Sequence, residues 1–254
     1  MVKRTGLAFG ILGALMLVWQ LVVAQPDNVD GTLEALRERL ATSLAAATQN
    51  QLQIARVART AMANIVEVEL DSGEILYSSE DGNFIIAGDL YSASADGLVN
   101  LSAQRRQVKV ADRIAAIPES EMILFTPEQI KATITVFTDV DCTFCRKLHA
   151  EIEQLNELGI EVRYMAYPRG GEQAESYQKM ISVWCSSDRK KSLTQAKNGQ
   201  NIPEFSCDNP VLKHYQLGNE FGIAGTPALI FPDGQVVPGY VEAQRLAAML
   251  SITP

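Results

Sequence analysis

The chain has 254 residues, four cysteines and a formal net charge of −8 at pH 7, with 47% hydrophobic and 20% charged residues. An excess of acidic residues argues against a nucleic-acid partner, because phosphate contacts require clustered lysine and arginine. This length fits one large domain or two smaller ones. The lack of cysteine between residues 25 and 141 favours two separately built units.

The first 24 residues have the order of a secretory signal peptide. Lys3 and Arg4 precede an apolar run that ends in Val-Val-Ala at residues 22 to 24, which is typical of a signal cleaved after residue 24. An uncleaved membrane anchor is the alternative, since this run is about long enough to cross a thin bilayer. We expect cleavage and export, which leaves 20 basic and 30 acidic residues and a net charge of −10.

Residues 25 to 101 are predicted to form a small domain. Leucines at helical spacing over residues 30 to 47 predict an amphipathic helix, whose apolar stripe either packs on its own domain or faces a partner. The next polar stretch either ends the helix or continues it, and we assign the helical segment to residues 30 to 60. From residue 63, three alternating segments separated by Asp- and Gly-containing turns predict an antiparallel meander. So small a sheet buries little apolar surface, and we expect a homodimer.

A linker helix over residues 102 to 118, stopped by Pro118, is predicted to lead into a second domain, residues 119 to 254. Residues 132 to 140 suit a buried central strand, and a helix and a second strand follow. This order predicts a βαβ unit with parallel strands. Four further segments complete the prediction: a mainly helical insertion over 172 to 200, a helix over 209 to 221, two strands around Asp233-Gly234 and a closing helix over 243 to 250.

Cys142 and Cys145 form a C-x-x-C motif at the junction of the central strand and its helix. Free backbone N–H groups and the helix dipole stabilise a thiolate at such a junction, and Arg146 and Lys147 add positive charge. We therefore expect Cys142 to have a lowered pKa and to attack, with Cys145 as the resolving thiol. This context predicts a thioredoxin-like redox motif. A structural disulfide is one alternative, and a metal site is another, although it lacks a second ligand pair at matched spacing.

Thr226 and Pro227 directly precede a predicted strand. In thioredoxin-like folds the matching proline is cis and faces the redox pair; the alternative is an ordinary trans proline that begins a strand. The four cysteines allow three pairings, and the sequence alone selects none of them. His149 and His214 lie on predicted helices, where each is more typical of a surface or packed residue than of a base.

Several segments together resemble the DsbC/DsbG family of periplasmic disulfide isomerases, over about residues 63 to 250. They are VFTDVDCTFCRKLH, GIEVRYMAYPRGG, VWCSSDRKKSL, SCDNPVLKHYQLGNEFGIAGTPALIF and PDGQVVPGY. The resemblance implies an α+β and α/β protein: a small antiparallel N-terminal dimerisation domain, a linker helix, and a C-terminal thioredoxin-like domain with a helical insertion. It implies a V-shaped homodimer in the periplasm, with two such domains facing a shared apolar cleft.

The resemblance also implies the roles of single residues and partners. It makes Cys142 and Cys145 the redox pair, with Thr143 and Phe144 between them as part of the active-site loop. It makes Thr226 and Pro227 the cis-proline loop, and it pairs Cys185 with Cys207 as a structural disulfide. No cofactor or metal is expected. The implied partners are misfolded or misbridged exported proteins, and a membrane thiol reductase of the DsbD type as electron donor.

Three departures from the family pattern bear on these expectations. Thr143-Phe144 stands where the isomerase usually has Gly-Tyr, and Arg146 stands where it has His. Both changes alter thiolate stabilisation and therefore the redox poise. The helical segment over residues 30 to 60 is not covered by the resemblance. Two rival functions stay open: a thiol oxidase of the same fold, and a holdase chaperone that binds unfolded chains in the cleft.

Overall fold

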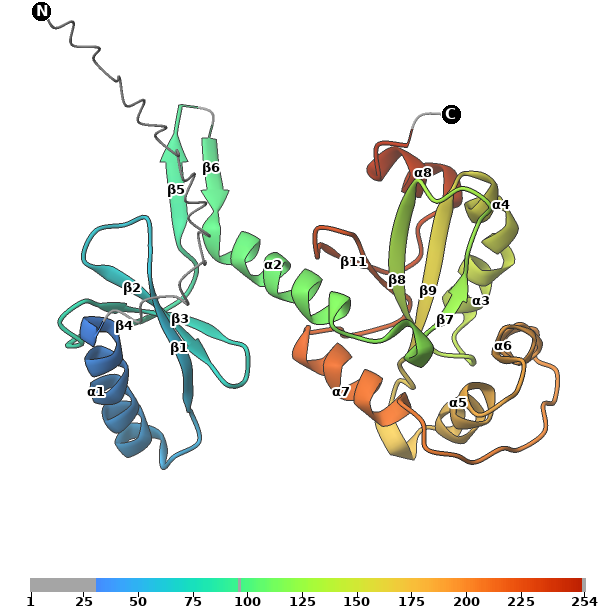
Figure 1. Cartoon of the computed structure of the whole chain (residues 1–254), viewed down its shortest axis with the longest axis horizontal. Coiled ribbons are helices and arrows are strands. Elements are labelled where there is room, and N and C mark those ends of the chain that lie inside the picture. The colour runs from blue at the N-terminus through green and yellow to red at the C-terminus, as the bar shows by residue number, and fades with distance from the viewer. Residues whose placement is uncertain (1–30, 96, 253–254) are drawn as a thin grey trace, which may run out of the picture.

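The computed structural model describes residues 31 to 95 and 97 to 252, so the predicted signal peptide lies outside the described residues. Figure 1 shows an N-terminal unit and a C-terminal unit joined by the helix α2 (Leu101–Ala115). Within those two ranges, no helix is both long and apolar enough to cross a membrane.

The N-terminal unit is a four-stranded antiparallel sheet covered by one helix. Its strands follow chain order: β1 (Ile54–Arg59), β2 (Ile65–Leu70), β3 (Ile75–Ser79) and β4 (Ile85–Ala87). Helix α1 (Gly31–Thr48) buries Leu36, Leu40 and Leu44 in one cluster with Val66 and Val68 of β2. The apolar stripe of α1 therefore packs on its own domain.

The prediction of helix up to residue 60 is wrong beyond Thr48. Gln49 and Asn50 have φ values of 53° and 63°, and residues in this left-handed region commonly end a helix. Residues 54 to 59 form β1 instead, in which Arg56 pairs with Glu67 of β2 at 3.1 Å. A cross-strand ion pair of this kind supports a half-exposed edge strand, whatever the helix propensity of the segment.

A hairpin of β5 (Tyr91–Ser94) and β6 (Gly97–Asn100) was also not predicted.

Helix α2 contacts both units. The Asn100 side chain caps its start by accepting the N–H of Ala103 at 2.8 Å. Lys109 pairs with Glu69 of β2 at 2.7 Å, while Arg113 near the other end pairs with Glu220 of the C-terminal unit at 2.8 Å. Ion pairs thus connect the helix to the N-terminal sheet and to the domain that follows.

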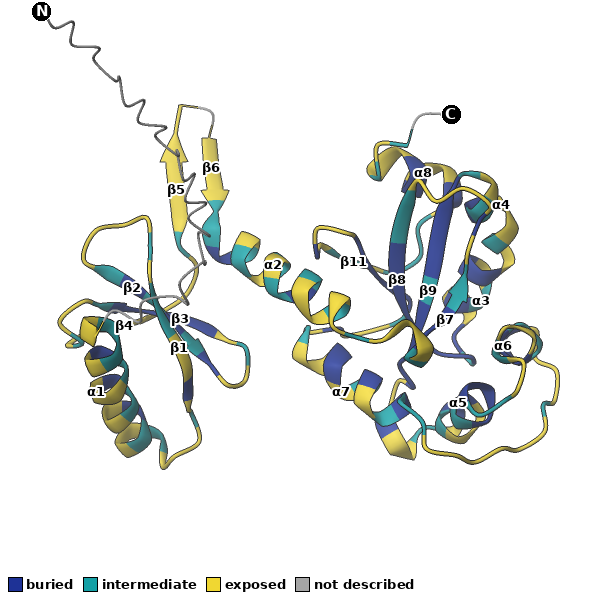
Figure 2. Ribbon diagram, in the orientation of Figure 1, coloured by how far each residue is buried: buried dark blue, intermediate teal, exposed yellow. Residues whose placement is uncertain are grey.

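The C-terminal unit contains a five-stranded sheet in the order β11-β10-β8-β9-β7. Its strands are β7 (Ile123–Phe125), β8 (Ala132–Thr138), β9 (Ile160–Ala166), β10 (Ala228–Ile230) and β11 (Val236–Pro238). Strands β8 and β9 are parallel, as the strand–helix–strand order predicted, and the other neighbours are antiparallel. Figure 2 shows that burial is concentrated on β8 and β9, so the central strands carry the core.

Helices cover both faces of this sheet. They are α3 (Thr143–Ala150), α4 (Ile152–Glu157), α5 (Glu175–Trp184), α6 (Arg189–Lys197), α7 (Val211–Glu220) and α8 (Ala243–Met249). Val136 of β8 is buried in one cluster with Leu148 of α3, and the next residue, Phe137, in a second cluster with Val110 of α2. Because side chains alternate along a strand, the two clusters lie on opposite faces.

The single helix predicted after the C-x-x-C motif is divided into α3 and α4 at Glu151. The Glu151 carboxylate accepts hydrogen bonds from the Tyr240 hydroxyl and from the backbone N–H of Ala243 at 2.9 Å. Ala243 is the first residue of α8, so this carboxylate links the interruption to the start of the last helix.

The turn between β10 and β11 approaches α2 closely at Gly234. A Cβ atom at this position would lie 1.8 Å from the carbonyl oxygen of Gln107, and the φ of Gly234 is 84°. Both the space and the left-handed backbone require glycine here. The close approach positions the linker helix against the C-terminal sheet.

Candidate active site

The C-x-x-C motif lies at the junction between the end of β8 and the start of α3. Cys142 is the N-cap residue of α3 with extended backbone (φ −84°, ψ 122°), and its carbonyl accepts the N–H of Arg146 at 3.0 Å. Both cysteines are free thiols; Cys142 is 3% exposed and Cys145 is fully buried. The Cys142 sulfur therefore lies at the positive end of a helix, close to unpaired N–H groups.

A second loop, distant in sequence, meets the first cysteine. The Thr226–Pro227 peptide bond is cis and stands immediately before β10. The Cys142 sulfur lies 3.2 Å from the carbonyl oxygen of Thr226, to which it donates when it is protonated, and the Pro227 carbonyl accepts the N–H of Gly239 at 2.8 Å. The structure thus brings together Cys142, Cys145 and the Thr226–Pro227 loop.

The two thiols have opposite pKa shifts. The pKa of Cys142 is lowered to about 5, chiefly by the hydrogen bond from the Cys145 thiol, against the opposing effect of burial. Thr226 and the backbone N–H groups of Cys145 and Phe144 lower it further. Burial raises the pKa of Cys145 well above its ordinary value, and the hydrogen bond to Cys142 adds to this. At neutral pH the site therefore holds a Cys142 thiolate beside a protonated Cys145.

The two basic residues after the motif play a different part from the one expected. The Arg146 guanidinium donates to the Val140 carbonyl at 3.0 Å and pairs with Asp141 at 3.2 Å. The Lys147 ammonium lies 4.4 Å from the centre of the Tyr240 ring. Hydrogen bonds at the start of α3 are therefore the main stabilisers of the Cys142 thiolate, and these two side chains are engaged elsewhere.

The dipeptide between the cysteines faces outward. Thr143 is exposed, and the Phe144 side chain is 59% exposed even though it is a large apolar group. An exposed phenyl ring next to a reactive thiolate offers an apolar contact to any polypeptide that approaches Cys142.

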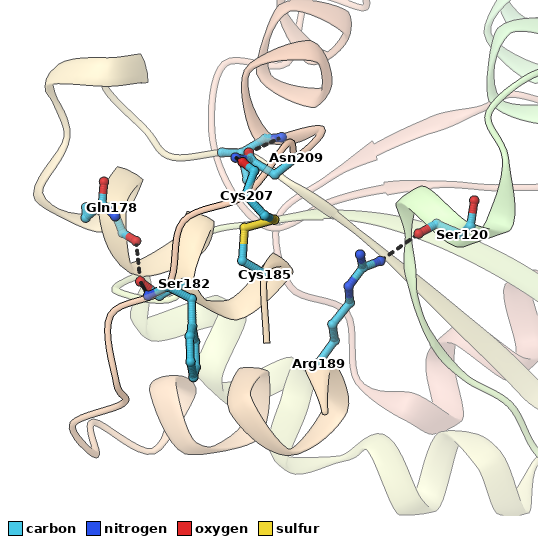
Figure 3. The surroundings of a disulfide bond; sticks show 9 residues. Ser120, Gln178, Ser182, Cys185, Arg189, Cys207 and Asn209 are labelled. Carbon is cyan, nitrogen blue, oxygen red and sulfur yellow. Dashed lines mark hydrogen bonds between the residues drawn. A yellow bond between two sulfur atoms is a disulfide. The ribbon is translucent and has the colours of Figure 1, made fainter. Parts of the chain in front are cut away.

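The other two cysteines form a disulfide, Cys185–Cys207, with their Cα atoms 5.7 Å apart (Figure 3). Cys185 follows the last residue of α5, and the Cys207 carbonyl accepts a hydrogen bond from the Asn209 side chain at 2.9 Å. The Arg189 side chain donates to the Ser120 carbonyl at 2.6 Å. The disulfide closes a covalent loop around α6, while Cys142 and Cys145 are left as thiols.

Both histidines are packed residues. His149 is 5% exposed and lies between the hydroxyls of Tyr164 at 3.1 Å and Thr194 at 2.9 Å. His214 is fully buried and accepts the N–H of Ala166 at 3.2 Å. Burial lowers the pKa of each to about 3, so both are neutral near pH 7. Among the described residues, no group of three or more His, Cys, Asp or Glu side chains is arranged to hold a metal.

Two further residues near the motif were not singled out from the sequence. The Asp139 carboxylate accepts the backbone N–H groups of Asp141 at 2.8 Å and Arg169 at 3.0 Å, which fixes the loop before Cys142. Lys197 at the end of α6 is buried and donates to the Thr138 hydroxyl at 2.7 Å. An Asp two residues before a turn is a recognisable signal, but nothing in the polar segment RKKSLTQAK indicates a buried lysine.

Comparison with known proteins assigns both units. Residues 118–252 match the family model of a thioredoxin-like domain, and residues 23–103 match that of the disulfide bond isomerase protein N-terminal domain. These matches confirm the expected fold class, a small N-terminal α+β domain followed by a thioredoxin-like domain.

Individual relatives agree with the family models. The thiol:disulfide interchange protein DsbC of Dickeya dadantii is 39% identical over 78% of this chain and 81% of its own length, and that of Escherichia coli K12 is 36% identical over 74% and 78%. The crystal structure of the disulfide interchange protein from Neisseria gonorrhoeae is 31% identical, covering 53% of this chain and 96% of that one, with a TM-score of 0.48. The chain belongs to the DsbC family of thiol:disulfide interchange proteins.

Proposed function

We propose that this chain catalyses thiol:disulfide exchange and isomerises wrong disulfides in exported proteins. The observation that carries the proposal is the Cys142 thiolate at the start of α3, next to a cis-proline loop and backed by a protonated Cys145. Cys142 is the nucleophile and Cys145 the resolving thiol. The loop of Thr226 and Pro227 presents the backbone of Thr226 to an extended substrate, and Thr143 and Phe144 contact it beside the thiolate.

In the proposed mechanism, the Cys142 thiolate attacks one sulfur of a substrate disulfide. A mixed disulfide forms and the second substrate sulfur leaves as a thiolate. That thiolate can attack another disulfide of the substrate, and a substrate thiol finally displaces Cys142, which leaves the enzyme reduced. If this fails, Cys145 attacks Cys142 and releases a reduced substrate from an oxidised enzyme.

The mechanism requires that the Cys142–Cys145 pair be kept reduced in an oxidising compartment. We propose the periplasm as that compartment, reached through the predicted signal peptide, and a membrane thiol reductase of the DsbD type as the electron donor. Support comes from the family membership and from the low pKa of Cys142, because a stabilised thiolate favours the reduced form of the pair.

We further propose a homodimer formed through residues 25 to 101, with residues 102 to 118 as linker and 119 to 254 as catalytic domain. Large apolar side chains of the N-terminal unit are exposed around the edge strand β4 and the hairpin β5–β6: Phe84 70%, Ile85 43%, Ile86 51%, Tyr91 53%, Leu98 73% and Val99 40%. An exposed apolar edge of this kind is typical of a strand-mediated interface. It would place two catalytic domains around one cleft for misfolded chains.

The dimer is tested by replacing Leu98 with glutamate and measuring sedimentation at micromolar concentration. We expect a monomer, with Met249→Glu on α8 as a matched control because Met249 is also exposed, at 40%. If Leu98→Glu sediments as the unaltered protein does, this surface is not the interface.

The catalytic proposal is tested by reactivation of a test enzyme whose four disulfides have been scrambled. Recovery that requires Cys142, and requires Cys145 only in part, supports isomerisation. No recovery together with rapid oxidation of a reduced substrate would favour the thiol oxidase. Suppression of aggregation that persists in Cys142→Ala without any reactivation by the unaltered protein would favour the holdase.

A further inference from the structure

Lys197, the last residue of α6, has a buried ammonium group close to the redox pair. The residue is 2% exposed, and its Nζ donates to the Thr138 hydroxyl at 2.7 Å and lies 5.3 Å from the centre of the Tyr164 ring. A buried ammonium is costly unless a negative group compensates for its charge. Its hydrogen-bond partner here is a neutral hydroxyl, so the negative charge that compensates the ammonium must come from a group beyond that hydroxyl.

The Thr138 hydroxyl connects Lys197 to the resolving cysteine. A hydroxyl can accept and donate at once, and this one accepts from Lys197 and hydrogen-bonds the sulfur of Cys145. Thr138 is the last residue of β8, a rigid central strand, so the bridge is held in place by the sheet. The connection therefore runs from ammonium to hydroxyl to the sulfur that must act second.

The charges of these groups respond to one another. Burial lowers the pKa of Lys197 to about 8, while negative charge on Cys145 and Cys142 raises it. In turn, the positive charge of Lys197 lowers the pKa of Cys145 against the larger effect of burial. The other titratable or charged groups that face Lys197 are Asp139, Arg146, His149 and Tyr164.

We propose that Lys197 is a positioning residue for the resolving step and that, through the Thr138 hydroxyl, it promotes formation of the Cys145 thiolate that attacks the mixed disulfide. This inference rests on the proposed thiol chemistry and adds a control point to it. A mixed disulfide has two fates: release by Cys145, which reduces the substrate, and continued reshuffling, which isomerises it. Lys197 sets the fraction of mixed disulfides that takes each route.

In the resolving step, the charges of these groups determine how protons and electrons move. When Cys142 enters a mixed disulfide it loses its negative charge, so the Lys197 ammonium more readily releases a proton to solvent and becomes a neutral amine. The Cys145 proton passes to the Thr138 oxygen, and the Thr138 proton passes to Lys197. The Cys145 thiolate attacks Cys142, the bond between Cys142 and the substrate sulfur breaks, and the enzyme disulfide forms. The substrate leaves as a thiolate and takes a proton from water, and Lys197 is again an ammonium.

The test is stopped-flow reaction of the reduced full-length protein with Ellman's reagent. The first thionitrobenzoate is released when Cys142 attacks, and the second when Cys145 resolves the mixed disulfide, so the two steps are measured separately. In Lys197→Met we expect the second phase to slow about tenfold at pH 7 and its pH midpoint to rise by about one unit, with the first phase little changed. Thr138→Val, which removes only the bridging hydroxyl, should have the same effect.

Thr135→Val is the matched control, because Thr135 is a buried threonine of the same strand, 4% exposed, on the opposite face of the sheet. It should leave both phases unchanged. An unaltered rate and pH midpoint of the second phase in both Lys197→Met and Thr138→Val would overturn the inference, and so would equal slowing of both phases. If the unaltered protein showed no first phase, the proposed thiol chemistry itself would fail.

Discussion

The hydrogen bond between the two thiols allows us to predict how replacing Cys145 changes the pKa of Cys142. The Cys145 thiol is the largest cause of the low pKa of Cys142, which falls from an ordinary 9.0 to about 5. Cys145→Ala removes this donor, whereas Cys145→Ser keeps a donor of similar size in the same place. We therefore expect the alanine variant to raise the pKa of Cys142 and the serine variant to leave it low.

The size of the effect follows from the energy of a charged hydrogen bond. Such a bond contributes about 1.5–3 kcal/mol, and one pKa unit corresponds to about 1.4 kcal/mol. The pKa of Cys142 in Cys145→Ala should therefore rise by about one to two units. The backbone N–H groups and Thr226 remain in this variant and keep the value below that of a free thiol.

The assay is the pH dependence of alkylation by iodoacetamide, since Cys145 is fully buried with a raised pKa, whereas Cys142 keeps 3% of its surface exposed and has the lowered pKa. The midpoint of the rate profile reports the pKa of Cys142 directly. Equal midpoints in the unaltered protein and the alanine variant would refute the reasoning and would assign the low pKa to the helix N-terminus alone. A serine variant that shifted as far as the alanine variant would also contradict it.

The remaining predictions concern stability, measured by urea unfolding. Replacing both disulfide cysteines by alanine should cost about 3 kcal/mol while the alkylation midpoint of Cys142 stays unchanged; a shifted midpoint would show that the disulfide also shapes the redox site. Gly239→Ala should cost about 1 kcal/mol, because its φ is 83° but space is open around it. Gly234→Ala, with nearly the same φ, should cost at least ~2 kcal/mol more through the clash with α2, and equal losses would refute the close approach. Because the folded pKa of Cys142 lies below its unfolded value, its contribution to the stability of the reduced protein is full above about pH 9 and is lost as the pH falls through about 5. The stability advantage of the reduced protein over Cys142→Ser should therefore be larger at pH 8 than at pH 5, and a constant difference would argue against a native thiolate.

The sequence predicted those parts of the molecule that depend on local order. The apolar run before the C-x-x-C motif, the helix after it and the next strand are adjacent in the chain, so a βαβ unit could be inferred from spacing alone. The meander of the N-terminal sheet was equally readable from its Asp- and Gly-containing turns. Strand β1 was missed because an Arg- and Ala-containing segment becomes a strand only through its pairing with β2.

The electrostatics of the site could be predicted only in part. A lowered pKa for Cys142 follows from its place at a helix start. The sequence also suggested that Arg146 and Lys147 stabilise the thiolate, but it could not show that their partners are Asp141 and Tyr240. Lys197 lies in a helix that looks solvent-exposed throughout its sequence. Its burial arises from the way α6 packs beside α3, α5 and β7, which no local pattern records.

The disulfide around α6 has a consequence for how the chain itself matures. Of the three ways to pair four cysteines, the one that includes the Cys185–Cys207 disulfide of the structure has the shortest closures: three residues within the C-x-x-C motif when that pair is oxidised, and 22 between Cys185 and Cys207. Either alternative joins the motif to cysteines at least 40 residues away, and shorter closures are entropically favoured in an unfolded chain. Random oxidation is thus biased towards the native pairing, so a protein that corrects disulfides in others has little need of correction while it folds.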